Sequence, residues 1–217
     1  MKKSFLAILL GLSVAASAQN VWEKPVVETD TPKEEVKTEE APKVLKDQKY
    51  LAGAVPEVDG KVEWTLEVDI PGKDAQQIYD AMLKYMMALT KESNQLPGSQ
   101  VSLVNKQHHI IVTSVNEWLV FAKKLLIMDR TKFRYTLITT CTDGHVQVIM
   151  KHITYKYEED RDPKNSFIRA EEWITDKYAM NKKGTRLYPV TVKFRRKTID
   201  RKDYLFENIM ETLKIEN

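Results

Sequence analysis

The sequence predicts an α+β fold in which an antiparallel sheet carries two helices on one of its faces. Two runs rich in Thr, Val, Ile and Tyr fill Thr131 to Tyr157, and Asp143-Gly144 joins them as a two-residue hairpin turn. Apolar residues recur at helical spacing in two further stretches, Asp74 to Leu89 and Asp200 to Lys214. The predicted order is therefore β-α-β-β-β-β-α, with the second face of the sheet open to water.

A change in the spacing of apolar residues predicts the first strand and the first helix. From Lys61 to Ile70 apolar side chains alternate with polar ones, as in a strand with one wet face, and Pro71-Gly72 ends the strand. Asp74 then caps a helix, with Gln77 at the third helical position as in a capping box. The helix keeps one apolar face as far as Leu89.

The next predicted strands are short. Gln100 to Val104 turns into a second strand from His109 to Val115, and Glu117 to Phe121 continues or follows that strand. For Leu125 to Met128 a short helix is an alternative, because a brief apolar run does not settle the period.

The two-residue turn also fixes the register of the hairpin. The pairs expected on its apolar side are Cys141 with Val146, Thr139 with Val148, Leu137 with Met150, and Tyr135 with His152. This side should carry the helices, so Cys141, the single cysteine of the chain, is expected to be buried.

The other side of the hairpin is the first candidate binding face, because it holds more apolar side chains than a purely solvated surface needs. Its residues are Arg134, Thr136, Ile138, Ile149, Lys151, Ile153 and Tyr155. The alternative is that the irregular insertion from Glu158 to Lys197 folds over this face and uses it as a second core.

A basic stretch before the last helix is the second candidate surface, where we expect a loop between a strand and the helix. Its cations are Lys193, Arg195, Arg196, Lys197, Arg201 and Lys202. They indicate a site for an anionic partner, and the alternative is a solvated surface whose charges pair with nearby acids.

Three blocks of sequence, together with the element order, resemble a known family. The blocks are EWLVF…DRTKFRYTLI, EEWITDKYAMNKK and KFRRKTIDRKDYLF. They are similar to an exported family of unknown function from Bacteroidetes, whose domain has a fold similar to the TATA-binding protein (TBP). The resemblance covers Leu51 to Asn217 and implies a curved, TBP-like sheet. It implies no activity and no site residues, and a similar fold does not imply binding to DNA.

The N-terminus has the pattern of a secretory signal peptide over residues 1–18. Met1-Lys2-Lys3 precedes the apolar run Phe5 to Val14, and a small-residue site predicts cleavage between Ala18 and Gln19. The apolar run is too short to span a membrane, and no cysteine follows the site, so a lipoprotein is not expected. We expect the mature protein to be periplasmic or secreted, without a transmembrane segment.

Residues 19–49, rich in Pro, Glu and Lys, are predicted to be a disordered tether ahead of one folded domain, 50–217. Without Lys2 and Lys3 the formal net charge falls from +3 to +1. This balance gives no electrostatic reason to bind nucleic acid.

No motif predicts a catalytic residue, a metal or a cofactor. The histidines His108, His109, His145 and His152 lack metal-ligand spacing, and the sequence holds no nucleophile motif or phosphate loop. The sequence favours a non-enzymatic binding module of the cell envelope, with an unknown protein or ligand as its partner. One alternative is a hydrolase using surface carboxylates such as Glu63 and Glu67, marked by two acids in one cleft. Another is a carrier of small hydrophobic ligands, marked by a closed cavity between the sheet and the last helix.

Overall fold

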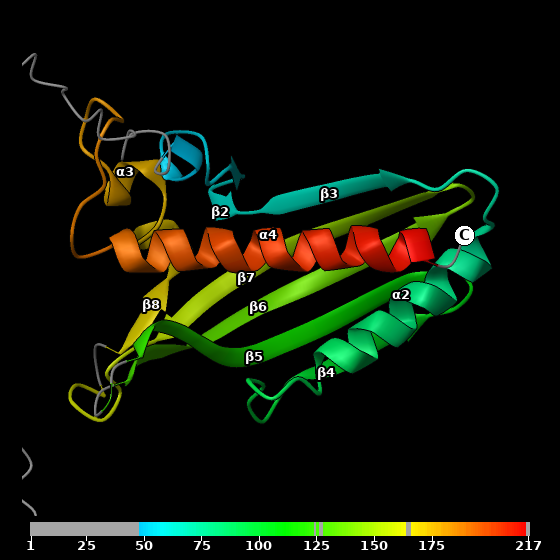
Figure 1. The fold of residues 1–217 in the computed structure, drawn as a ribbon, viewed down its shortest axis with the longest axis horizontal. Coiled ribbons are helices and arrows are strands. Elements are labelled where there is room, and N and C mark those ends of the chain that lie inside the picture. Colours follow the sequence, from blue (N-terminus) through cyan, green and yellow to red (C-terminus); the bar gives the residue numbers. More distant parts are fainter. Residues whose placement is uncertain (1–47, 124, 126–127, 164–165, 216–217) are drawn as a thin grey trace, which may run out of the picture. The chain divides into compact units, whose positions relative to one another are not determined.

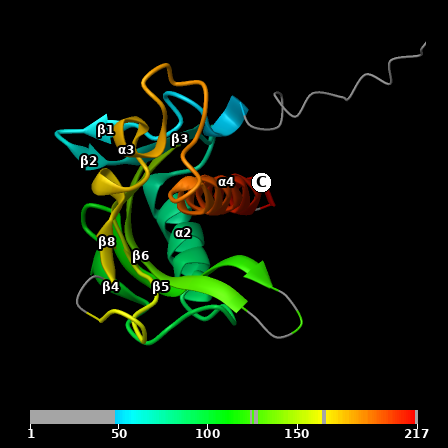
Figure 2. The same ribbon diagram turned by 90° about the vertical axis from the view of Figure 1, so that its left-hand side faces the viewer.

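The computed structural model describes residues 48–215 with the exception of 124, 126, 127, 164 and 165. The predicted signal peptide, its cleavage site at Ala18 and Gln19, and most of the predicted tether lie outside the described residues. The described part forms a curved antiparallel sheet with two long helices on one of its faces (Figures 1 and 2). The predicted fold class is therefore confirmed.

The described residues form a six-stranded sheet in the order β3-β7-β6-β5-β4, and β8 also pairs with β7. Its strands are β3 (Trp64–Asp69), β4 (Gln100–Asn105), β5 (Ile110–Lys123), β6 (Met128–Thr142), β7 (His145–Lys156) and β8 (Phe167–Arg169). Two shorter strands, β1 (Glu57–Val58) and β2 (Lys61–Val62), form a separate ribbon. The predicted strand from Lys61 to Ile70 is confirmed over Trp64–Asp69, whereas Lys61 and Val62 form a separate strand, which the positive φ of Asp59 and Gly60 turns back onto β1.

Strand β5 continues without a break to Lys123, so it includes the stretch from Glu117 to Phe121. Its partner β6 begins at Met128, which pairs with Lys123. Met128 therefore belongs to a strand and not to a short helix.

Helix α2 (Ala75–Leu89) begins as the sequence predicts. The Asp74 carboxylate accepts a hydrogen bond from the Gln77 backbone N–H at 2.8 Å, and the Gln77 side chain accepts one from the Asp74 N–H at 3.1 Å. This reciprocal capping box satisfies two backbone donors that the helix itself leaves unpaired.

Helix α4 (Val192–Ile215) begins at Val192, well before the predicted start at Asp200. The basic stretch is therefore its first turns rather than a loop. Lys and Arg are good helix formers, and Phe194 and Ile199, both buried, continue the apolar stripe toward the N-terminus of the helix. The structure also corrects the start of the domain, since Gln48 and Lys49 belong to the short turn η1 (Gln48–Tyr50).

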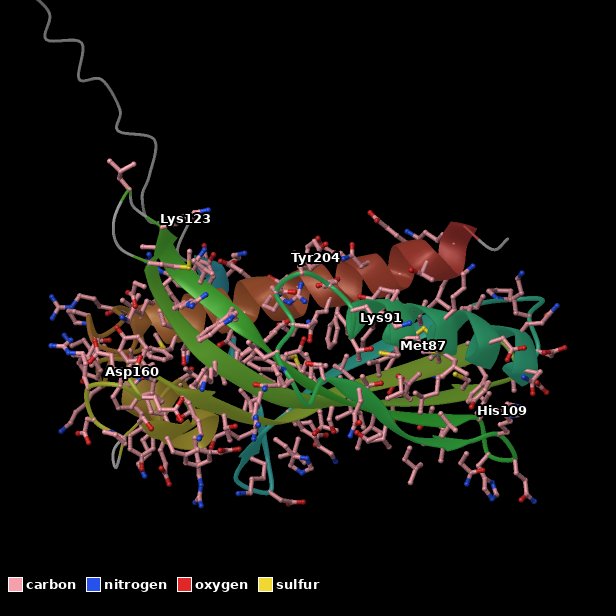
Figure 3. The ribbon with its side chains drawn as sticks, turned by 90° about the horizontal axis from the view of Figure 1, so that it is seen from below. Met87, Lys91, His109, Lys123, Asp160 and Tyr204 are labelled. Atoms are coloured by element: carbon pink, nitrogen blue, oxygen red, sulfur yellow. The ribbon has the colours of Figure 1, made fainter. Side chains whose placement is uncertain are left out.

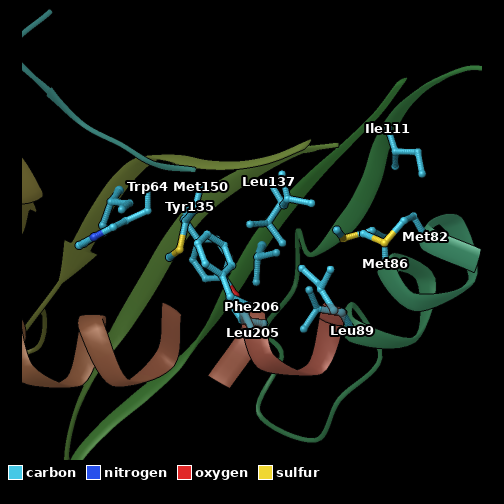
Figure 4. Packing of buried hydrophobic residues seen from close by; sticks show 14 of the residues in the cluster. Trp64, Met82, Met86, Leu89, Ile111, Tyr135, Leu137, Met150, Leu205 and Phe206 are labelled. Atoms are coloured by element: carbon cyan, nitrogen blue, oxygen red, sulfur yellow. The ribbon is translucent and has the colours of Figure 1, made fainter. Parts of the chain in front are cut away.

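Both long helices bury their apolar faces against the same side of the sheet, and Figure 4 shows the packing between them. The side chains that meet there include Met82, Met86, Leu89, Tyr135, Leu137, Met150, Leu205 and Phe206. Each such side chain contributes roughly 1.5–3 kcal/mol when it is fully buried. Cys141 lies in the same core at 2% exposure, as expected, and burial raises the pKa of its thiol to about 12.

The predicted register of the hairpin holds along most of its length and fails at one residue. Cys141, Thr139 and Leu137 face their expected partners, but the register shifts between Arg134 and Thr136. His152 adopts a φ of +56° in β7, opposite this shift, and forms a β-bulge. It therefore does not pair with Tyr135.

The bulge turns the following residues of β7 to the other face of the sheet. Ile153 and Tyr155 are both 1% exposed in the core, where the Tyr155 hydroxyl lies 2.7 Å from Thr198 Oγ1 on α4. Placing these two residues on the open face was therefore wrong. Thr136 pairs with Lys151 and Ile138 with Ile149 on the open side, as expected.

The insertion after β7 extends the edge of the sheet. Its strand β8 pairs with residues 154–156 of β7, beyond the part of β7 that pairs with β3. The turn η2 (Ala170–Glu172) and the short helix α3 (Asp176–Ala179) follow, and Trp173 packs edge-on against Phe194 of α4 at 5.9 Å. The later part of the insertion, from η2 onward, thus packs on the helix side, and the alternative that the whole insertion covers the open face is wrong.

Candidate functional site

Two rows of side chains cross the open face of the sheet, because directly paired residues of neighbouring strands point to the same side. The first row contains Asn116, Arg134, Thr154 and Arg169, from β5, β6, β7 and β8. The second row contains Trp118, Lys132, Lys156 and Phe167, from the same four strands. The rows are two residues apart along each strand, which corresponds to about 7 Å. Figure 3 shows side chains projecting from the face opposite α4, with Asp160 and His109 at opposite ends of the sheet.

In the first row, the Arg134 side chain is exposed and makes no hydrogen bond or ion pair with any of the described residues. Its neighbour Asn116 is only 7% exposed. The Asn116 amide Nδ2 donates to the Pro97 carbonyl at 2.8 Å, which fixes the orientation of the side chain. The carbonyl oxygen Oδ1 of Asn116 is buried and has no partner in the described part of the chain. A free cation and an unsatisfied acceptor therefore lie side by side.

The loop before β4 holds Asn116 in this position. The Asn116 backbone donates to Ser99 Oγ at 2.8 Å, and its carbonyl accepts from the Leu96 N–H at 2.7 Å. Because the backbone and the amide are both anchored, the position of the Asn116 side chain is fixed.

Two hollows meet at this row. One, of about 370 Å³, extends from Asn116 and Arg134 toward Lys156 and Phe167. The other, of about 330 Å³, shares Asn116, Arg134 and Thr154. It is otherwise lined largely by polar groups, among them Gln100, Ser114, Thr136 and His152. Together they form a shallow groove with cations at one end and hydroxyl and amide groups at the other.

In the second row, Lys132 and Lys156 share one carboxylate. Lys132 Nζ lies 2.6 Å from Glu159 Oε2, and Lys156 Nζ lies 3.2 Å from Glu159 Oε1. Hydrogen bonds from Lys132 and then Lys156 hold the pKa of Glu159 below its usual range. Beside them, the Arg130 guanidinium lies 3.7 Å from the centre of the Trp118 ring.

The predicted basic patch does not exist as one surface. The fully buried Arg195 donates to the carbonyl oxygens of Tyr50, Leu51 and Ile174 and to Asp176 Oδ1, at 2.6–2.7 Å. It therefore ties α4 to the start of the domain and to the insertion.

The remaining basic side chains of this stretch point in several directions. Lys193 pairs with Asp129 at 2.9 Å, Arg201 with Glu117 at 2.7 Å, and Lys202 with Asp203. The Arg196 guanidinium lies 5.4 Å from the centre of the Tyr50 ring, and Lys197 is half-buried on α4. Most of these charges are thus engaged by the protein itself.

Sequence reasoning missed a buried charge cluster beneath α4. The Glu117 carboxylate accepts from Arg201 Nε at 2.8 Å, from Arg201 Nη2 at 2.7 Å and from the Tyr135 hydroxyl at 3.1 Å. Asn94 and Gln95 donate to Glu117 Oε2 at 3.1 and 2.7 Å. The signal in the sequence was an acid at an inward position of β5, between the buried Val115 and Leu119.

This environment changes the pKa of two members of the cluster. Burial, followed by the charge of Glu117, raises the pKa of Tyr135 well above its usual value. Burial alone would lower the pKa of Arg201, but the bonds to Glu117 raise it overall. The Arg201 guanidinium therefore keeps its positive charge.

The surface acids of the sequence analysis pair with basic side chains. His145 lies between Asp69 and Glu67, at 2.8 and 2.7 Å, and Glu63 faces Lys151 at 3.7 Å. Each acid of the Glu63 and Glu67 pair therefore has its own basic partner. Across the described residues, no three His, Cys, Asp or Glu side chains gather in a way that could hold a metal ion.

The space between the sheet and the helices is filled by side chains. The hollow bordered by Ile70, Ile78 and Leu213 measures about 10 Å³, which is at most the space of one water. This packing gives no support to the carrier of small hydrophobic ligands. Among the residues that the structure describes, no helix has the length and apolar character needed to cross a membrane.

The architecture, an antiparallel curved sheet with its helices on one face, defines an α+β protein of the TBP-like class. Residues 64–156 match a family model described as a domain of unknown function (DUF4468) with TBP-like fold. A solved DUF4468 family protein from Bacteroides ovatus ATCC 8483 is 40% identical, with a TM-score of 0.71. The match covers 77% of this chain and 94% of that one. The chain belongs to the DUF4468 family.

A solved TBP-like protein from Parabacteroides distasonis ATCC 8503 has the same fold at 22% identity, with a TM-score of 0.60. That match covers 74% of this chain and 97% of the other. No curated protein matches the sequence.

Proposed function

We propose that this protein is an exported, non-enzymatic binding module of the cell envelope that takes an acidic oligosaccharide in the groove of its open sheet face. One observation carries the proposal. Arg134, a cation without a partner among the described residues, lies beside Asn116, whose buried carbonyl oxygen lacks a donor. Arg134 is exposed, so an anionic ligand can reach its guanidinium, and the fixed Asn116 side chain forms the wall of the groove beside it.

The charge of the groove selects an acid. A guanidinium binds a carboxylate through two parallel hydrogen bonds, which are about twice as strong as bonds between neutral groups. Arg169, in the same row, lies 3.8 Å from Glu172, and Lys132 and Lys156, in the next row, share Glu159. Together with Arg134 these cations outnumber the two acids, so the groove is positive at this end. A carboxylate at Arg134 is therefore the expected anchor of the ligand.

The neutral end of the groove selects a ligand rich in hydroxyl groups. Gln100, Ser114 and Thr136 offer hydroxyl and amide groups along the hollow. A peptide adding a strand would need an unpaired strand edge, but β6 is paired with β5 and β7 on both sides. Recognition here runs through side chains, which suits a sugar acid better than an extended peptide.

Calorimetric titration of the full-length mature protein with trigalacturonate tests the proposal. Replacing Arg134 with Gln should weaken binding about 10- to 100-fold, the loss expected for charged hydrogen bonds. Arg134→Lys should give an intermediate loss, because it keeps the charge but not the two-pronged geometry. Arg186→Gln, which removes an exposed guanidinium in the insertion, is the matched control and should bind normally.

Two further ligands distinguish recognition of the carboxylates from recognition of the sugar hydroxyl groups. The methyl ester of the same trisaccharide keeps every hydroxyl but lacks the carboxylates, and it should bind at least ten times more weakly. A triglutamate peptide carries the charge without the sugar hydroxyls. Equal binding of the peptide, or equal binding by the Arg134→Gln variant, would contradict the proposal.

A further inference from the structure

The loop that follows β7 places a carboxylate of the protein itself in the groove. We infer that Glu159 occupies the position of a second carboxylate of the ligand, so that the ligand carries at least two carboxylates and displaces the Glu159 side chain when it binds. The inference rests on the proposed function, because it concerns the neighbouring row of the same groove.

The geometry of the second row supports this role. Lys132 and Lys156 are direct cross-strand partners, and their ammonium groups converge on the two oxygens of Glu159 at 2.6 and 3.2 Å. One carboxylate bridging two ammonium groups is the arrangement that an anionic ligand would form there. Lys132 lies two residues from Arg134 on β6, a separation of about 7 Å. The two anion positions are therefore adjacent along one strand.

The bridge can be exchanged at little cost. The side chains of Lys132, Lys156 and Glu159 are 39%, 40% and 35% exposed, so water reaches each of them. Exposed ion pairs stabilise a protein only weakly, because solvent screens them and holding the side chains costs entropy. A ligand already anchored at Arg134 brings its second carboxylate to these lysines at high local concentration.

The loop closes on itself independently of the two lysines. The Glu158 carbonyl accepts hydrogen bonds from the backbone of Arg161 at 2.9 Å and of Asp162 at 3.0 Å. The Glu158 side chain pairs with Arg161 at 3.0 Å. Glu159 can thus leave the lysines while the turn remains intact, and the exposed Asp160 carries the same charge next to it.

The experiment compares Glu159→Gln with Asp160→Asn in the full-length mature protein. Both variants remove one negative charge from the same loop, but only the first frees Lys132 and Lys156. Calorimetric titration with trigalacturonate should show binding about three times tighter for Glu159→Gln, the change expected for an exposed ion pair. Asp160→Asn should change binding less than half as much. The difference should shrink at high salt, where exposed charges are screened.

Galacturonate, which has a single carboxylate, tests binding at the first row without the second. It should bind at Arg134 with the same affinity in Glu159→Gln and in the unmodified protein, because it does not reach the lysines. Equal effects of Glu159→Gln and Asp160→Asn on trigalacturonate would overturn the inference, and so would weaker binding by Glu159→Gln. In both cases a loss of binding by Arg134→Gln would leave the proposed function standing, and its absence would remove both.

Discussion

The Glu117 carboxylate, with 1% of its side chain exposed, depends on Arg201 for its charge balance. Removing one partner of a buried ion pair leaves an uncompensated charge, which typically costs 3–5 kcal/mol. Arg201→Met should therefore lower the free energy of unfolding by about that amount, as measured by urea denaturation. The double variant Arg201→Met with Glu117→Gln should recover part of the loss. A loss below about 1 kcal/mol in the single variant would contradict the prediction, because it would show that Glu117 and Arg201 contribute no more than an exposed ion pair.

His145 makes stability depend on pH at the β3–β7 end of the sheet. Hydrogen bonds to Asp69 and then Glu67 raise the pKa of His145 above its usual value of 6.5. A raised folded-state pKa means that the stabilisation is complete below pH 6.5 and is lost as the pH rises through the folded-state value. The melting temperature should therefore fall between pH 5.5 and pH 8.5, and His145→Asn should reduce this fall.

His108→Asn, which changes an exposed histidine elsewhere, is the control for the pH series. It should leave the pH dependence of the melting temperature unchanged. If His145→Asn and His108→Asn give the same profile, the contacts of His145 with the two acids do not contribute to stability.

At the scale of elements, the sequence correctly predicted the helix start and the turn whose local sequence patterns agree with their packing in the fold. The capping box at Asp74 and the Asp143-Gly144 turn depend only on neighbouring residues, and both formed as expected. The start of α4 was missed because its first turns bury Arg195, a residue type that normally indicates a solvated surface. The burial of Arg195 is favourable only because η1, the insertion and the residues next to them supply three backbone carbonyl oxygens and the Asp176 carboxylate as hydrogen-bond acceptors.

The same reasoning explains how much of the candidate site could be predicted. Arg134 was identified, because strand alternation places it on the open face. Ile153 and Tyr155 were misassigned, because a single bulge residue moves every later side chain to the opposite face. Asn116 was missed, since its importance depends on the loop at Ser99 and Pro97.

The bulge itself can be tested at His152. A φ of +56° costs an L-residue about 1–2 kcal/mol, and glycine avoids this cost. His152→Gly should therefore preserve or raise the free energy of unfolding, whereas His152→Val should lower it by at least about 1 kcal/mol in chemical denaturation. Lys151→Gly, at the preceding regular strand position, should be destabilising by about 0.5–1 kcal/mol. Equal losses for both glycine variants would contradict a specific role of the bulge.

At the scale of the whole molecule, the helices and the later part of the insertion pack on one side of the sheet and leave the groove on the other. The core side satisfies its own charges, as Arg195 and Arg201 show. On the open side, Arg134 has no partner among the described residues, and Lys132 and Lys156 share an exposed one. Stability and ligand binding are therefore expected to respond to different substitutions, which lets the two be measured separately.

The proposed role in the envelope also requires export, and the N-terminus allows a direct test. Signal peptidase requires a small residue before the cleaved bond, so Ala18→Arg should leave the precursor uncleaved. The unmodified protein should appear in the periplasmic or secreted fraction with Gln19 as its first residue, as determined by N-terminal sequencing. Gln19→Asn, on the other side of the bond, should be processed normally. An unmodified protein that keeps Met1 and stays in the cytosol would remove the envelope role while leaving binding at Arg134 open to the titrations above.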